Sequence, residues 1–118
     1  MRPAREGGAM GPYFQLTTTT ASRADAERLA RLGVEGRLAA CGQVSGPLTS
    51  VYRWEGAVQE AEEWRCTFKT SAHALERLCH LVRQAHDYTT PEIVATAITG
   101  GDPDYLAWID DETTAPGG

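Results

Sequence analysis

Hydrophobic and aromatic residues with strand character fill two neighbouring stretches in the middle of the chain, residues 50–54 (SVYRW) and 64–70 (WRCTFKT). β-Branched and aromatic side chains suit a pleated, half-buried surface. Between the two stretches, Glu55-Gly56 offers the permissive backbone of a tight reversal, and the polar residues 60–63 (EAEE) follow it. We predict a long antiparallel hairpin with an acidic, solvated tip.

The first half of the chain predicts one strand and one helix. Alternating side chains predict a strand over residues 13–20 (YFQLTTTT). Ser22 resembles a helix N-cap, and apolar residues then recur at three- and four-residue spacing until about Gly36. Gly33 lies on this apolar face, where the missing side chain permits close packing on a sheet.

The second half predicts a helix, a strand and a short final helix. Leucines and other apolar residues from Ser71 to about His86 form the cleanest helical stripe of the chain. A strand is expected over residues 91–99, and Gly100-Gly101 ends it. Asp102, followed by proline, marks the start of a last helix that extends to about residue 111.

The order of these elements is β-α-β-β-α-β with an additional C-terminal helix. Two βαβ units of this kind predict an α+β, ferredoxin-like sandwich, with an antiparallel sheet and both main helices on one face. We expect the other face to stay uncovered and apolar. Tyr52, Trp54 and Trp108 are the aromatic residues for which a single chain offers too little cover, so we predict that copies of the chain associate through them.

Composition restricts the class of protein. The 118 residues, 42% of them hydrophobic, are enough for one folded domain. The net charge of −5 argues against nucleic acid as a partner. Three cysteines without a CxxC pair favour a reducing cytoplasmic compartment, and no apolar run approaches the ~20 residues that span a membrane. We expect a disordered leader (1–11), a folded domain (12–113) and a loose tail (114–118).

Several motifs together resemble the CutA divalent-cation-tolerance family. They are LAAC (38–41), SVYRWEG (50–56), the His-x-Tyr-x-x-Pro-Glu-Ile run (86–93) and DPDYLAW (102–108). The resemblance implies a ferredoxin-like fold similar to PII regulatory proteins and a homotrimer with sheets packed inward. It also implies a cytosolic protein that is linked to copper and other divalent cations and has no established enzymatic activity.

The same resemblance implies a metal site made by Cys41, His86 and Glu92, because thiolate and imidazole ligands suit copper or zinc. No local spacing supports these three residues, and the alternative is a buried thiol and a solvated helix end. The chain departs from the family pattern at Asp87, where proline is usual, and at Thr89, where an acid is usual.

A second candidate site is a cleft between subunits, which would bind an anion or another small ligand. Arg53, Trp54, Lys69 and Tyr88 are the residues expected to line it. The alternative is that Arg53 and Trp54 only hold the subunits together, because both residue types are enriched at interfaces.

Three functions compete. The first is a non-enzymatic trimer for divalent metal ion, and specifically copper, tolerance; the second is a PII-like regulator that binds a small effector. An enzyme such as acylphosphatase shares the topology, but TTTTASRAD (17–25) replaces its glycine-rich phosphate loop. A metal screen against a small-anion screen would separate the first two, because a ligand that prefers the native state stabilises it.

Overall fold

The computed structural model describes residues 12–114 and contains four strands and three helices in that range. The predicted leader and nearly all of the predicted tail therefore lie outside the described residues. In chain order the elements are β1 (Tyr13–Thr20), α1 (Arg23–Glu35), β2 (Cys41–Trp54), β3 (Ala57–Ser71), α2 (Ala72–Ala85), β4 (Val94–Ala97) and α3 (Pro103–Glu112).

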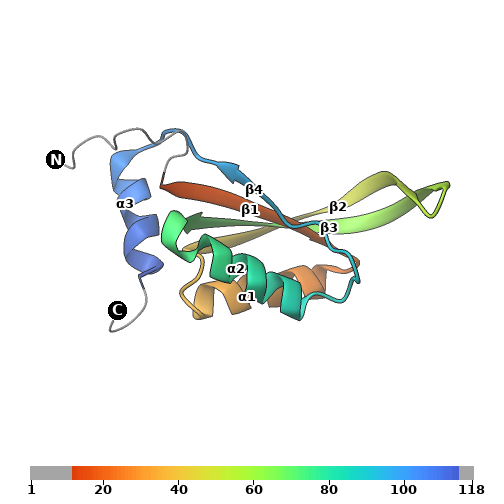
Figure 1. Ribbon diagram of the computed structural model, residues 1–118, viewed down its shortest axis with the longest axis horizontal. Coiled ribbons are helices and arrows are strands. Elements are labelled where there is room, and N and C mark those ends of the chain that lie inside the picture. The colour runs from red at the N-terminus through yellow and green to blue at the C-terminus, as the bar shows by residue number, and fades with distance from the viewer. Residues whose placement is uncertain (1–11, 115–118) are drawn as a thin grey trace.

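The four strands form one antiparallel sheet in the order β2-β3-β1-β4. Helices α1 and α2 lie side by side against one face of it, and the distal half of the β2–β3 hairpin projects beyond them (Figure 1). Helix α3 lies at the opposite end of the molecule, across the ends of the strands (Figure 1). The predicted α+β, ferredoxin-like sandwich with an extra C-terminal helix is confirmed.

The main core lies between the sheet and the two long helices. Leu16 of β1, Phe68 of β3, Leu29 of α1 and Leu78 of α2 are all less than 2% exposed. Gly33 of α1 lies directly over Phe68, and a Cβ atom placed on it would come within 2.7 Å of the Phe68 ring. The predicted role of this glycine, close packing of the helix on the sheet, is confirmed.

The predicted helix starts are confirmed, with one difference in how they are capped. The Ser22 hydroxyl accepts the Asp25 N–H, and the Asp102 carboxylate accepts the Tyr105 N–H. Helix α2 does begin after Ser71, but the Ser71 hydroxyl makes no capping bond and instead contacts Thr113 near the end of α3. The hydroxyl thus contacts the C-terminal segment and the His73 ring, but caps no backbone N–H of α2.

The hairpin is longer than predicted; its reversal lies at Glu55-Gly56 as predicted, but the acidic residues are not at its tip. Strand β2 begins at Cys41 rather than near Ser50, with a register shift between Ser45 and Leu48. The reversal consists of Glu55 and Gly56, which both have positive φ, of 50° and 80°. This backbone fits the right-handed twist of a two-residue hairpin. Residues 60–63 (EAEE) therefore lie within β3 and pair with β2. Their charges are tolerated there because both faces of the projecting ribbon meet water.

The face of the sheet opposite α1 and α2 also differs from the expectation. Residues paired across neighbouring strands point to the same face, and the register pairs Gln15 with Lys69 and Thr17 with Thr67 on this face. It is therefore polar and not apolar. The register places Tyr52 and Trp54 on the same side of β3 as Lys69, but on the part of the hairpin that projects beyond the helices, and Trp108 lies on α3.

Helix α3 covers one end of the polar face. Ile109 is fully buried with Tyr13 and Ala40 in a small second core. Arg37, in the turn after α1, donates to the carbonyls of Asp111 and Thr114 at 2.9 Å each, so it caps the C-terminal end of α3. Strand β4 has four residues rather than the nine predicted over residues 91–99.

Candidate functional site

Cys41 stands at the first position of β2 and is partly exposed. Its Sγ lies 3.8 Å from the phenolic oxygen of Tyr105 on α3. Across the ladder it is directly opposite Lys69. The cysteine therefore borders the polar face, and it is not the plain buried group that was the alternative interpretation.

His86 ends α2, and both of its ring nitrogens are engaged. Nδ1 accepts the Tyr88 N–H at 3.0 Å, so Nε2 carries the proton and donates it to the Thr19 carbonyl at 2.8 Å. This arrangement favours the tautomer that carries its hydrogen on Nε2. A metal ion could bind His86 only after one of these two hydrogen bonds is broken.

Tyr88 connects the loop after α2 to the base of the hairpin. Its phenol donates to the Glu63 carboxylate at 2.9 Å, and its ring lies 4.8 Å from that of His86. Burial and then the hydrogen bond to Glu63 raise the pKa of Tyr88 to about 12. Trp64, beside Glu63, is the first β3 residue in chain order that pairs with β1. The contact thus lies where the hairpin leaves the sheet.

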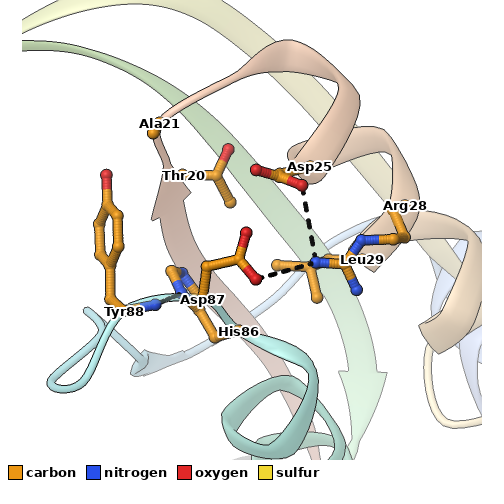
Figure 2. Close-up of a pocket in the computed structure, with 8 residues that line it drawn as sticks. All are labelled: Thr20, Ala21, Asp25, Arg28, Leu29, His86, Asp87 and Tyr88. Carbon is orange, nitrogen blue, oxygen red and sulfur yellow. Dashed lines mark hydrogen bonds and ion pairs between the residues drawn. The ribbon is translucent and has the colours of Figure 1, made fainter.

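A small cavity of about 20 Å³ separates the start of α1 from the end of α2. Figure 2 shows Arg28 between the carboxylates of Asp25 and Asp87, at 3.7 and 4.0 Å. Arg28 also donates to the Ala85 carbonyl at the end of α2. Asp87, which replaces the usual proline, is therefore held in an ion pair, and the cavity has room for little more than one water molecule.

The three ligands implied by the resemblance do not meet within one chain. Among residues 12–114 no three His, Cys, Asp or Glu side chains are close enough to hold a metal ion. Cys41 lies beside α3, His86 lies at the far end of α2, and Glu92 is exposed just before β4. A metal site built from them requires more than one copy of the chain.

The four predicted cleft residues are also apart in a single chain. Trp54 and Arg53 lie beside the hairpin turn, whereas Lys69 is twelve residues beyond Ala57 along β3. At ~3.3 Å per residue this is a separation of roughly 40 Å. Tyr88 contacts β3 between the hairpin turn and Lys69, where its phenol donates to Glu63. Such a cleft, too, requires a second copy.

One face of the projecting hairpin carries no charge. The register places six residues on this face, namely Ser50, Tyr52, Trp54, Ala57, Gln59 and Ala61. Tyr52 is 43% exposed and Trp54 is 49% exposed. An isolated two-stranded ribbon is at best marginally stable in water, and exposed apolar patches mark interaction sites. Trp108, on α3 at the other end of the molecule, is 38% exposed.

A group of polar residues that was not expected joins α2 to α3. His73 Nε2 lies 3.2 Å from the hydroxyl of Ser71 and from the Thr113 carbonyl, and Nδ1 lies 3.9 Å from Asp110. Ser71, His73 and Asp110 have the residue types of a hydrolytic triad. Ser71 is only 1% exposed and is bonded to Thr113 at 2.7 Å, so no substrate reaches it. The group fastens the C-terminal segment, and sequence spacing gave no signal for it.

The fold defines a class: a small α+β sandwich with a four-stranded antiparallel sheet and a projecting hairpin. The family model for the CutA1 divalent ion tolerance protein matches residues 14–112. The chain belongs to this family.

Individual relatives agree with this assignment. The divalent-cation tolerance protein CutA of Thermus thermophilus is 43% identical over 95 residues, which cover 80% of this chain and 92% of the relative. The crystal structure of CutA1 from Shewanella sp. SIB1 superposes with a TM-score of 0.86 at 31% identity, covering 90% of this chain and 99% of that one. The crystal structure of CutA from Xylella fastidiosa superposes with a TM-score of 0.85 at 30% identity, covering 88% of this chain and 100% of that one.

Within the described residues, no helix is both long and apolar enough to cross a membrane.

Proposed function

We propose that this chain acts in divalent-cation tolerance as a non-enzymatic, cytoplasmic homotrimer, with copper as the cation. Family membership over residues 14–112 supports the link to divalent cations. The observation that supports the assembly is the exposure of Tyr52 and Trp54 on a hairpin that projects beyond the helices. Cys41, His86 and Glu92 lie apart within one chain. If they bind a metal ion, residues of different copies must supply the ligands.

The uncharged face of the hairpin supports the assembly. Tyr52 and Trp54 have little cover in one chain, and the ribbon that carries them projects beyond the helices (Figure 1). A second copy that covers this face would remove both rings from water. Threefold association offers every hairpin an equivalent partner.

The chemistry of the ligands supports copper. Thiolate and imidazole are ligands that copper and zinc prefer over magnesium or calcium. His86 must exchange one of its two hydrogen bonds for the metal, so binding separates the ring from either the Thr19 carbonyl or the Tyr88 N–H. Because the thiol loses its proton on binding, copper affinity should fall as the pH is lowered.

Calorimetric titration with copper tests the proposal in the wild type, Cys41→Ser and His86→Ala. Loss of binding in both variants is expected. A matched control is His80→Ala, which removes an exposed histidine of α2 that is in none of the candidate sites. Equal affinity and stoichiometry in wild type and His86→Ala would show that His86 is not a copper ligand and would contradict the proposed metal site.

A further inference from the structure

His73, the second residue of α2, joins its helix to the end of α3. Its Nε2 lies 3.2 Å from the Thr113 carbonyl oxygen and 3.2 Å from Ser71 Oγ. Because a carbonyl oxygen only accepts, Nε2 carries the hydrogen and donates it. The neutral ring therefore has its lone pair on Nδ1, which lies 3.9 Å from the Asp110 carboxylate of α3.

The two hydroxyls beside this ring complete one consistent set of hydrogen bonds. Ser71 Oγ accepts from His73 and so keeps its own hydrogen for Thr113 Oγ1, at 2.7 Å. The Thr113 hydroxyl in turn donates to the Ile109 carbonyl at 2.8 Å. Ser71 is 1% exposed and Thr113 is fully buried, so these bonds are shielded from water. The chain of donors runs from His73 through the end of β3 into the last turn of α3.

Acid adds a contact to this set and removes none. A protonated imidazole keeps its Nε2 hydrogen and gains a second one on Nδ1. Nδ1 is the ring atom that lies 3.9 Å from the Asp110 carboxylate. Protonation of His73 therefore preserves the bonds to Ser71 and Thr113 and creates an ion pair with α3.

The other charges around the ring largely offset one another. His73 lies at the positive N-terminal end of α2 and against the negative C-terminal end of α3, so the two helix dipoles oppose each other there. Arg77, which donates to the His73 carbonyl, and Glu76 carry opposite charges on the next turn of α2. Arg37, at the end of α3, lies 3.9 Å from Glu112. Within residues 12–114, the acid beside Nδ1 is the charge that this balance leaves to act on the ring.

From this arrangement we infer that His73 is a pH-sensitive latch, which holds the C-terminal end of α3 more firmly when the ring is protonated. Histidine changes its charge between pH 5 and 8. The ion pair with Asp110 thus stabilises the closed latch at the acid end of this range and is lost as the pH rises. The latch goes beyond the metal-linked function proposed above, because none of its groups is a candidate metal ligand.

Hydrogen exchange of the α3 amides, followed by mass spectrometry in metal-free buffer, measures how often this helix opens. The variant His73→Gln retains an amide donor and cannot titrate. At each pH, the ratio of its exchange rate to that of the wild type cancels the intrinsic pH dependence of exchange. Between pH 8 and pH 5 the ratio should rise by about two- to fivefold, as for one partly exposed ion pair. A ratio that stays constant or falls would overturn the inference.

Two further variants separate the latch from a purely structural contact. Asp110→Asn removes the charge and retains the shape, so in that background His73→Gln should give the same exchange ratio at both pH values. A rise as large as in the wild-type background would contradict the role of Asp110. The matched control, His80→Gln, removes an exposed histidine of α2 outside the group, and its ratio should not change with pH.

Nitrogen-15 NMR of the His73 ring at pH 8 tests the hydrogen-bond assignment independently. The hydrogen is expected on Nε2, because this atom donates to the Thr113 carbonyl. The His73 signals are identified by their loss in His73→Gln. A neutral ring with its hydrogen on Nδ1 would contradict the latch, because Nε2 could then not bind the carbonyl.

Discussion

The phenol of Tyr88 donates a 2.9 Å hydrogen bond to the carboxylate of Glu63, and so ties the loop after α2 to the base of the projecting hairpin. Tyr88 also donates its backbone N–H to His86, a candidate metal ligand. One residue thus connects the histidine to the hairpin. A change at the histidine can therefore alter how firmly the hairpin is held.

Tyr88→Phe should destabilise the fold by about 0.5–1.5 kcal/mol, because it leaves Glu63 without this donor and preserves the ring. Urea denaturation measures the change in the free energy of unfolding. Tyr105→Phe is a suitable control, because the Tyr105 hydroxyl has only a 3.8 Å contact with the Cys41 sulfur. An equal decrease in the free energy of unfolding in the two variants would show that the hydrogen bond to Glu63 does not stabilise the fold.

The Tyr88 contact also predicts a dependence on pH. The pKa of Tyr88 is raised to about 12 in the folded protein, from an ordinary value near 10. Between pH 10 and 12 the unfolded chain ionises at this residue while the folded chain stays neutral, so stability is lost as the pH rises. The stability difference between wild type and Tyr88→Phe should be constant below pH 10 and shrink above it. An unchanged difference up to pH 12 would contradict the assigned cause.

Much of the fold was predictable because local patterns agreed with one another. The strand Tyr13–Thr20 and the starts of α1 and α3 follow directly from alternation and capping residues. The length of the hairpin was not predictable. Polar residues 60–63 look like a turn, yet in a ribbon with two exposed faces their pairing with β2 decides the structure.

The candidate site was less accessible from the sequence. Motifs identified Cys41, His86 and Tyr88 individually, but no pattern showed that Tyr88 binds Glu63, 25 residues earlier. The polarity of the sheet face was missed for a related reason. It becomes visible only when the register places Gln15, Lys69 and Gln43 on the same side.

The cysteines should differ in reactivity toward a thiol reagent. Burial, with a smaller contribution from Cys41, raises the pKa of Cys66 to about 12, so its thiolate is scarce at neutral pH. Burial also raises the pKa of Cys79. Cys41 is partly exposed and should be modified first. Mass spectrometry of the digested protein after brief alkylation locates the label; modification of Cys66 ahead of Cys41 in the native state would contradict the described core.

Truncation in the main core should be costly. Leu78 is fully buried against the sheet, and Leu78→Ala should destabilise the fold by about 2–5 kcal/mol. Arg77, next to it on the exposed side of α2, makes one 3.3 Å contact with the His73 carbonyl, so Arg77→Ala should cost little. Thermal and urea unfolding of both variants provide the comparison. A small effect of Leu78→Ala would mean that α2 is not packed on the sheet as described.

Trp54 should matter mainly for association. It is 49% exposed in one chain, so its truncation removes little from the core. If copies meet through the uncharged face of the hairpin, Trp54→Ala should cost on the order of 2–4 kcal/mol per site. The melting temperature of the variant should then depend more strongly on protein concentration. A matched change, Val58→Ala, lies on the other face of the ribbon and should have a smaller effect.

The central claim is that this family member works as an assembly of three copies that share metal ligands. Native mass spectrometry of the purified full chain, with and without copper, tests it most directly because it reports subunit number and metal stoichiometry together. The account predicts a mass of three chains in both samples, and copper bound only to the trimer. A single-chain mass of 12.8 kDa in both samples, or copper bound equally to single chains, would contradict it.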